Sequence, residues 1–175
     1  MNYFEIFGID NKFAIDLDAL TERYQSIQKS VHPDKFAHAS SQEQALAVKK
    51  STLINDAFQT LKSPLKRAEY MLTLRGVEMP NEQASFSDNS FLMRQMELRE
   101  MLAEVKYADD IDAAIFEVSQ TLEVEFEQLF KEMQIQLKDN TEQSNKGACD
   151  NLRKLKFYQK LHIELDRLED LLFED

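Results

Sequence analysis

The sequence has no tryptophan and, among its 175 residues, only one cysteine, three glycines and three prolines. So few turn-forming residues disfavour a sheet protein, because successive strands need frequent turns. The lone Cys149 cannot form an internal disulfide, and one thiolate cannot hold zinc or an iron–sulfur cluster without further ligands. No apolar run approaches the roughly 20 residues of a membrane span. These absences favour a helix-rich globular protein with no cofactor, no metal site and no membrane partner.

The opening residues, Met1–Phe7, lack the basic region and the apolar core of a secretory signal peptide. Disulfides persist mainly in oxidising compartments, and this chain has no second cysteine with which to form one. We therefore expect a cytoplasmic protein. Cys149 itself is expected to be a partly exposed residue without a role.

Positive charge is scarce, and it is unevenly distributed. Residues 1–75 contain 10 Lys and Arg against 9 Asp and Glu, whereas residues 76–175 contain 11 against 23, so the net charges are +1 and −12. A nucleic-acid-binding protein needs a basic surface to neutralise phosphates, so this balance argues against nucleic acid as a partner. It indicates a two-part molecule whose acidic C-terminal part suits a basic partner.

Apolar residues spaced by three and four predict a set of amphipathic helices in residues 1–75. The expected ranges are about Tyr3–Phe7, Asp18–Val31, Ser41–Leu61 and Leu65–Leu74. Gly8 terminates the first helix, and Pro33 ends the second because proline disfavours helical geometry in the residue before it. Ser63 and Pro64 open the last of these helices as its N-cap and first helical residue.

Residues 76–89 contain Gly76, Pro80 and several Asn and Ser but little periodicity, which is typical of a linker or a packed connector. Longer helices follow over about Ser90–Lys106, Asp109–Lys138 and Ala148–Phe173. Short polar turns join them, as expected for an antiparallel three-helix bundle. The sequence thus predicts an all-α protein with a domain over residues 1–75, a linker over 76–89 and a second domain over 90–175.

The tripeptide His32-Pro33-Asp34 directly follows the second predicted helix. Proline restricts φ and shapes a rigid projection, while His and Asp offer a donor and an acceptor to a partner. A His–Asp pair could also act as an acid–base dyad. However, no activated nucleophile, glycine-rich phosphate loop or metal-ligand cluster accompanies it, and His38 and His162 are expected on the surface. We therefore predict a docking loop and no catalytic residue.

Several motifs around this tripeptide occur in the order typical of J-domains, and the chain resembles that family over residues 1–75. The motifs are Tyr3–Ile9, Arg23-Tyr24, Val31–Phe36, Ile54–Leu61 and Arg67–Tyr70. The resemblance implies a non-enzymatic co-chaperone that docks on an ATP-bound DnaK-class chaperone and promotes nucleotide hydrolysis there. The implied chaperone-binding residues are Arg23, Tyr24, Lys29, His32, Pro33, Asp34 and Lys35. Glu22, Gln25 and Gln28 make the second helix less basic than is usual in the family, which favours a specialised chaperone partner.

The helix predicted over residues 90–106 has more apolar positions than one core face needs. Its expected buried stripe is Phe91, Leu98, Leu102 and Val105. Away from that stripe lie Leu92, Met93 and Met96, beside Glu97, Glu100 and Glu104. An apolar patch bordered by carboxylates is typical of a protein interface, because Met adapts to a partner's shape. Periodicity leaves a second reading open, in which the patch packs on the J-domain or a neighbouring helix.

The C-terminal motifs extend the resemblance over nearly the whole chain, to the HscB-type co-chaperones of iron–sulfur cluster assembly. The matching blocks are Pro64–Tyr70, Phe91–Glu100 and Leu152–Phe157, whereas residues 107–147 match only in helical pattern. The resemblance implies that the C-terminal domain binds an IscU-type cluster scaffold and that the J-domain delivers it to a dedicated HscA-type chaperone. The implied scaffold-binding residues are Leu92, Met93, Met96, Glu97, Glu100, Glu104 and Phe157. A general J-domain holdase for unrelated unfolded clients is the alternative.

Overall fold

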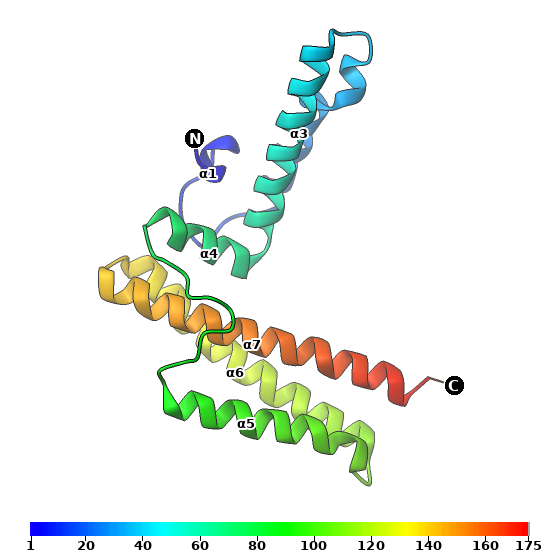
Figure 1. The fold of residues 1–175 in the computed structure, drawn as a ribbon, viewed down its shortest axis with the longest axis vertical. Helices are drawn as coiled ribbons and strands as arrows, with labels where there is room; N and C mark the ends of the chain where they lie inside the picture. The colour runs from blue at the N-terminus through cyan, green and yellow to red at the C-terminus, as the bar shows by residue number, and fades with distance from the viewer. Residues whose placement is uncertain (175) are drawn as a thin grey trace. The chain divides into compact units, whose positions relative to one another are not determined.

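The computed structural model describes residues 1–174, and within them every regular element is helical (Figure 1). The predicted all-α class is confirmed. The chain divides into two compact units that meet between Val77 and Glu78. The finer division into a domain over residues 1–75, a linker over 76–89 and a domain from residue 90 onward stays a prediction. No helix in residues 1–174 is long and apolar enough to cross a membrane.

The N-terminal unit is a helical hairpin with two further helices packed at its base. Its elements are α1 (Tyr3–Ile6), α2 (Leu17–Val31), η1 (Pro33–Phe36), α3 (Ser41–Lys62) and α4 (Pro64–Leu74). α2 and α3 form the hairpin, η1 lies in its turn, and α1 and α4 pack against α3. The completely buried side chains of this unit include Phe4, Leu20, Ala57, Leu61, Ala68, Met71 and Leu72.

Local signals set the ends of these helices as the sequence predicts. The Asp16 side chain caps α2 by accepting from two backbone N–H groups in its first turn. α2 ends at Val31, directly before the His-Pro dipeptide, and Ser63 caps α4 with Pro64 as its first residue. Gly8 has a φ of 61° and takes the left-handed conformation just after α1, which itself ends at Ile6.

The hairpin projects beyond the helices at its base, and this explains how far the apolar side chains of α2 are buried. Leu20, near the base, is completely buried, whereas Tyr24, Ile27 and Val31 are only half-buried. The outer part of α2 packs on α3 alone, so one side of each of these side chains remains open. The turn of the hairpin, which contains His32, therefore lies at the exposed end of the unit.

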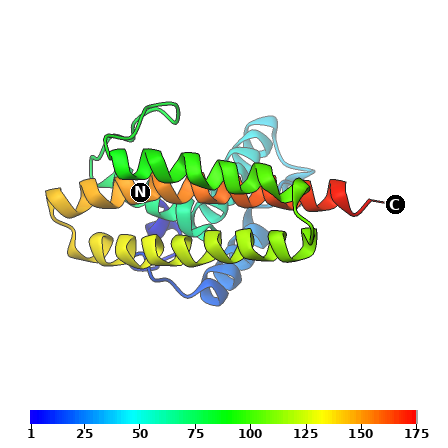
Figure 2. The same ribbon diagram turned by 90° about the horizontal axis from the view of Figure 1, so that it is seen from below.

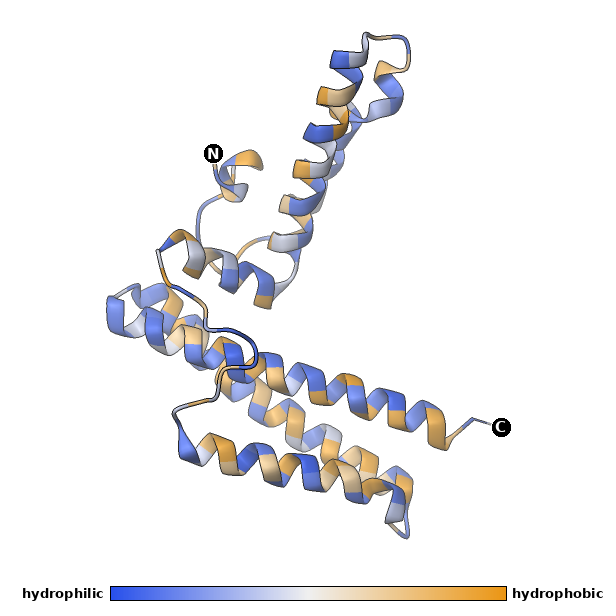
Figure 3. Ribbon diagram, viewed as in Figure 1, coloured by the Kyte–Doolittle hydropathy of each residue, from blue (hydrophilic) through white to orange (hydrophobic). Residues whose placement is uncertain are grey.

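The C-terminal unit is a bundle of α5 (Asn89–Glu104), α6 (Ile111–Asp139) and α7 (Glu142–Leu172), with η2 (Val105–Tyr107) after α5. Figure 2 shows these long helices lying along one another, and Figure 3 shows hydrophobic and hydrophilic residues alternating along them. The shared core is Phe91, Leu98, Val105, Ile115, Val118, Leu122, Tyr158, Leu161 and Leu165. The predicted α5 stripe is confirmed, with Leu102 partly buried beside this core.

α7 begins at Glu142, so the predicted start near Ala148 is wrong. Thr141 and Ser144 form a capping box in which each side chain accepts from the other's backbone N–H. Gly147 therefore lies inside the helix, where a Cβ atom would come within 2.5 Å of Gln136 Nε2 on α6. This glycine leaves room for a side chain of the neighbouring helix and does not mark a helix end.

Residues 79–88 precede α5 and pack along α7 as a connector. Met79 Sδ lies 3.3 Å from Cys149 Sγ, and the Arg153 guanidinium covers the Phe86 ring at 4.3 Å. Cys149 is buried, with an exposed fraction of 5%. The expectation of a partly exposed cysteine is therefore wrong, because a methionine far from it in the sequence lies over the thiol.

Candidate functional site

The His32-Pro33-Asp34 loop is an exposed, locally bonded turn between α2 and η1. His32 is the C-cap of α2 and the N-cap of η1, and its Nδ1 accepts from the Asp34 backbone N–H at 3.2 Å. The side chains of His32 and Asp34 are 53% and 91% exposed. Because Nδ1 accepts a hydrogen bond, the neutral imidazole carries its proton on Nε2. The loop therefore presents one donor and one carboxylate acceptor to a partner.

The surrounding residues hold this loop in place. Pro33 occupies the first position of η1, where its fixed φ suits a helical turn, and Lys35 N–H donates to the His32 carbonyl at 3.1 Å. The Gln44 side chain on α3 donates to the carbonyls of Phe36 and Ala37 at 3.2 and 3.1 Å. The turn is thus closed by its own backbone and bonded to α3, while the Lys35 side chain is exposed.

The structure places the predicted chaperone-binding residues of α2 in two different roles. Lys29 is exposed on the outer part of the helix. Tyr24 is half-buried: its ring stacks on Phe58 at 4.0 Å, and its hydroxyl donates to Asn55 Oδ1 at 3.1 Å. Arg23 Nη1 donates to the carbonyls of Phe7 and Gly8, at 2.6 and 2.5 Å. Arg23 and Tyr24 therefore connect α2 to other parts of the N-terminal unit, in addition to any contact with a partner.

Arg23→Ala is expected to destabilise the N-terminal unit by about 1–2 kcal/mol, because two carbonyls lose a charged donor. Lys29→Ala is the matched control, since it removes an exposed basic side chain from the same helix and is expected to change stability by less than about 0.5 kcal/mol. Urea unfolding of the full chain, followed by circular dichroism, measures both. Equal unfolding midpoints for the two variants would show that the Arg23 bonds do not stabilise the unit.

α5 carries the patch of Leu92, Met93 and Met96, for which the sequence allows either an interface or packing within the protein. Met93 and Met96 are 64% and 73% exposed, and Leu92 is half-buried. Glu97, Glu100 and Glu104 are exposed beside them. Within their own unit, the two methionines thus lie on the surface and do not pack on a neighbouring helix. This geometry favours the interface reading of the patch over the packing one.

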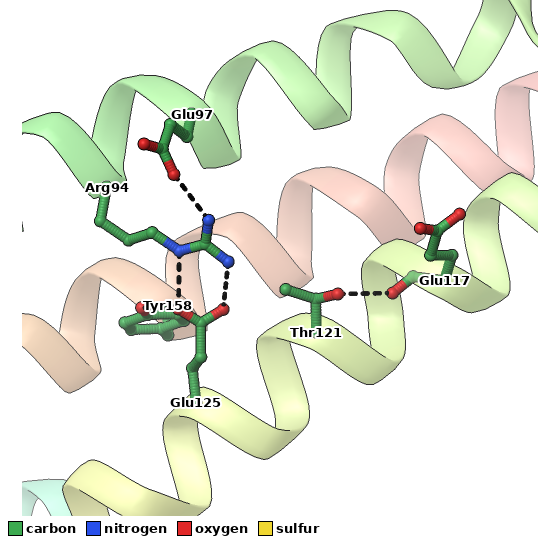
Figure 4. Close-up of polar contacts among 6 residues, drawn as sticks. All are labelled: Arg94, Glu97, Glu117, Thr121, Glu125 and Tyr158. Carbon is green, nitrogen blue, oxygen red and sulfur yellow. Dashed lines mark hydrogen bonds and ion pairs between the residues drawn. The ribbon is translucent and has the colours of Figure 1, made fainter.

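An ion-pair network, which sequence reasoning missed, anchors this face of α5 to α6 (Figure 4). Arg94 Nε and Nη2 donate to both oxygens of Glu125 at 2.7 and 2.9 Å, and Nη1 donates to Glu97 at 2.7 Å. The Tyr158 hydroxyl of α7 donates to Glu125 Oε1 at 3.1 Å. The bonds to Glu125 and then Glu97 raise the pKa of Arg94. Burial raises the pKa of Tyr158, and the Glu125 carboxylate adds to this.

The Arg94 network also includes a residue on the exposed face of α5. Arg94 bonds Glu97, so one of the implied scaffold-binding residues is held by a side chain that is itself bonded to α6. Its partner Glu125 stands 31 positions away, in the region to which the sequence assigns no site. No local signal identifies that pairing.

Phe157 of α7 lies against the same helix. Its ring meets Phe91 edge-on at 5.8 Å, and the Arg99 guanidinium lies over it at 5.5 Å. Arg99 stands three residues after Met96 and so shares its side of α5. The structure therefore places Phe157, which is half-buried, against Phe91 and Arg99 of α5.

The fold and these surfaces define a class of protein, a J-domain co-chaperone. The sequence matches the family model described as DnaJ domain over residues 2–70 and the one described as HSCB C-terminal oligomerisation domain over residues 87–166. The two matches fall in the two compact units in turn. The resemblance to J-domains is thereby confirmed.

The particular family follows from whole-chain comparisons. The chain is 63% identical to the co-chaperone protein HscB homolog of Colwellia psychrerythraea over 175 residues, which is all of both chains. It is 46% identical to the homolog of Shewanella halifaxensis, with 99% of this chain and all of the other covered. The chain belongs to the HscB family of co-chaperones, which is not a family of enzymes.

Solved structures agree with this assignment. The chaperone HscB from Vibrio cholerae superposes with a TM-score of 0.93 at 42% identity, covering 98% of this chain and 100% of that one. Human co-chaperone protein HscB superposes with a TM-score of 0.88 at 30% identity, covering 97% and 82%. The prediction of an N-terminal J-domain followed by a C-terminal helical domain of the HscB type is confirmed, and with it a role as a J-domain co-chaperone in iron–sulfur cluster assembly.

Proposed function

We propose that the N-terminal unit docks on an ATP-bound, HscA-type chaperone of the DnaK class and accelerates ATP hydrolysis there. The observation that carries this proposal is the exposed His32-Pro33-Asp34 turn at the projecting end of the hairpin. Its backbone is held by a bond within the turn and by the bonds that Gln44 of α3 donates, so little conformational entropy is lost on docking. Lys29 and Lys35 are exposed on either side of the turn and supply positive charge to the contact.

We propose further that the C-terminal unit binds an IscU-type cluster scaffold. The surface would comprise Leu92, Met93, Met96, Glu97, Glu100, Glu104 and Phe157. Its centre is apolar and adaptable, because methionine side chains accept many shapes, and its border is acidic. The network of Arg94 with Glu125 holds the centre of α5 on the bundle, so the surface is largely formed before the partner binds.

Joining these two activities in one chain makes the protein an adaptor of the cytoplasm. A scaffold held by the C-terminal unit reaches the chaperone together with the J-domain, so the second encounter occurs at a raised effective concentration. The chain supplies no catalytic group in this scheme: the bond to the γ-phosphate is broken in the chaperone. The function is therefore delivery of one client combined with a timed stimulus to hydrolysis, which promotes cluster transfer.

A general holdase for unrelated unfolded clients is the second candidate. The exposed Met93 and Met96 favour it, because flexible apolar side chains bind many sequences. The acidic border disfavours it, since three carboxylates beside a small patch select a basic partner and repel acidic segments. The C-terminal half carries the net negative charge that suits such selection.

Single-turnover ATP hydrolysis by an HscA-type chaperone tests the proposal. The rate is measured with the apo scaffold alone, with this chain alone and with both. We expect the rate with both to exceed the sum of the separate effects by about tenfold, because one molecule positions the client and the stimulus together. Replacement of the scaffold by a reduced, unfolded client protein is the control. Equal stimulation by both clients would support the holdase instead.

A further inference from the structure

A groove lies where α5 turns through η2 into α6, at the end of the proposed scaffold surface, with which it shares Glu104. Its volume is about 460 Å³. The residues that line it include Glu104, Val105, Tyr107, Glu117 and Val118. They come from three consecutive elements of one compact unit, so the groove belongs to the bundle itself.

The floor of this groove is apolar, and its rim carries an exposed aromatic ring. Val105 and Val118 in the floor belong to the shared core of the bundle. Tyr107 on the rim is 78% exposed, although a tyrosine ring is among the largest apolar surfaces a side chain can offer. Lys106 lies over that ring with its Nζ 5.1 Å from the centroid. The groove can therefore accept an apolar side chain and cover it with Tyr107.

The groove is also flanked by carboxylates from both helices. Glu104 of α5 and Glu117 of α6 both line it. Glu117 is exposed, and Figure 4 shows its carboxylate projecting away from α6, one turn before Thr121. Further exposed acids follow in the turn and the first residues of α6: Asp109, Asp110 and Asp112. A positively charged group at the mouth of the groove would thus be attracted from several directions.

The groove continues the proposed scaffold surface without a break. Met93, Glu97, Glu100 and Glu104 follow one another at steps of four, three and four residues, so they form one ridge along α5. The last of them, Glu104, is also a wall of the groove. A partner that lies along the ridge in the direction of the helix arrives at the groove.

We propose that this groove is a second subsite of the same surface, which receives an apolar side chain flanked by Lys or Arg from the cluster scaffold. The inference rests on the proposed function, since it names the same partner. The ridge with Met93 and Met96 gives the first point of contact, and the groove gives a second near the α5–α6 turn. Two separated contacts specify the orientation of the scaffold on α5, which one apolar patch does not.

Isothermal titration of the full chain with the apo scaffold tests the subsite. Tyr107→Ala removes the rim, and Glu117→Lys reverses a charge; each is expected to weaken binding about tenfold, as central contacts in interfaces do. Phe116→Ala is the control for loss of an exposed aromatic ring, and Glu123→Lys repeats the charge change on another side of α6. Both controls are expected to bind as wild type. The Glu117→Lys defect should shrink at high salt, where surface charges are screened.

A Met93→Ala, Met96→Ala variant separates this inference from the proposed function. Weaker binding by that variant with unchanged binding by Tyr107→Ala and Glu117→Lys would overturn the subsite alone. Unchanged binding by all variants would overturn the scaffold surface and the subsite together. Losses in the control variants equal to those in the groove variants would also overturn the subsite. Sedimentation of the free chain completes the test: self-association that Tyr107→Ala abolishes would assign the groove to a second copy instead.

Discussion

His32→Gln is expected to abolish stimulation of the chaperone ATPase while leaving fold and scaffold binding intact. The imidazole is more than half exposed, and its contacts within the chain are local ones to Asp34, so its loss costs the fold about 1 kcal/mol or less. What is lost is the Nε2 donor, whose position is set by the rigid turn around Pro33. Loss of a central contact of this kind costs about 2 kcal/mol or more of the free energy of docking. Stimulation of hydrolysis is therefore expected to fall by at least about thirtyfold.

His38→Gln is the matched control for this substitution. His38 is an exposed histidine in the same stretch between α2 and α3, but it lies outside the tripeptide. We expect it to stimulate hydrolysis as the wild type does. Steady-state ATP turnover by the chaperone, at fixed chaperone and rising co-chaperone concentrations, measures both variants. Undiminished stimulation by His32→Gln would show that the loop does not dock on the chaperone through His32.

Simultaneous replacement of Leu92, Met93 and Met96 by alanine is expected to weaken scaffold binding by about thirtyfold or more. The two methionines are exposed in the structure and Leu92 is half-buried, so the substitutions remove surface that a partner would cover. Truncation of a hot spot in an interface usually costs about 2 kcal/mol of binding free energy, which corresponds to a loss of affinity of about thirtyfold. Titration calorimetry with the apo scaffold gives the affinity.

Thermal unfolding distinguishes an interface role from a core role for the same residues. We expect the triple variant to melt within a few degrees of the wild type, with Leu92 responsible for most of any change. Leu98→Ala provides the contrast, because Leu98 is 1% exposed and truncation of a core leucine costs roughly 2–5 kcal/mol. A triple variant that melts as low as Leu98→Ala would mean that the patch belongs to the core.

The sequence predicted the elements of this protein best where neighbouring residues decide them. Pro33 ends α2, and Ser63 with Pro64 starts α4, because these effects act within one turn of the chain. The start of α7 is different, although the capping box of Thr141 and Ser144 that begins this helix is also local. Gly147 inside the helix resembles a terminator unless its contact with Gln136 on α6 is known.

The candidate sites show the same division. The His32-Pro33-Asp34 turn and the excess of apolar residues on α5 are visible in the sequence, because a turn and a helix face are short-range features. The sequence does not show whether Met93 and Met96 face solvent, because exposure depends on which helices lie nearby. Phe157 entered the predicted surface through resemblance alone, and only the packing of α7 on α5 places it beside Arg99.

The sequence by itself therefore determined the helical class, the His32-Pro33-Asp34 turn after α2 and the acidic character of the C-terminal half. The tertiary structure alone decided that Arg23 bonds to the end of α1, that Glu125 holds Arg94, and that Cys149 is buried under Met79. It also formed the groove at the α5–α6 turn. The physical reason is distance along the chain: these pairs stand 16, 31 and 70 positions apart, where periodicity and capping carry no information.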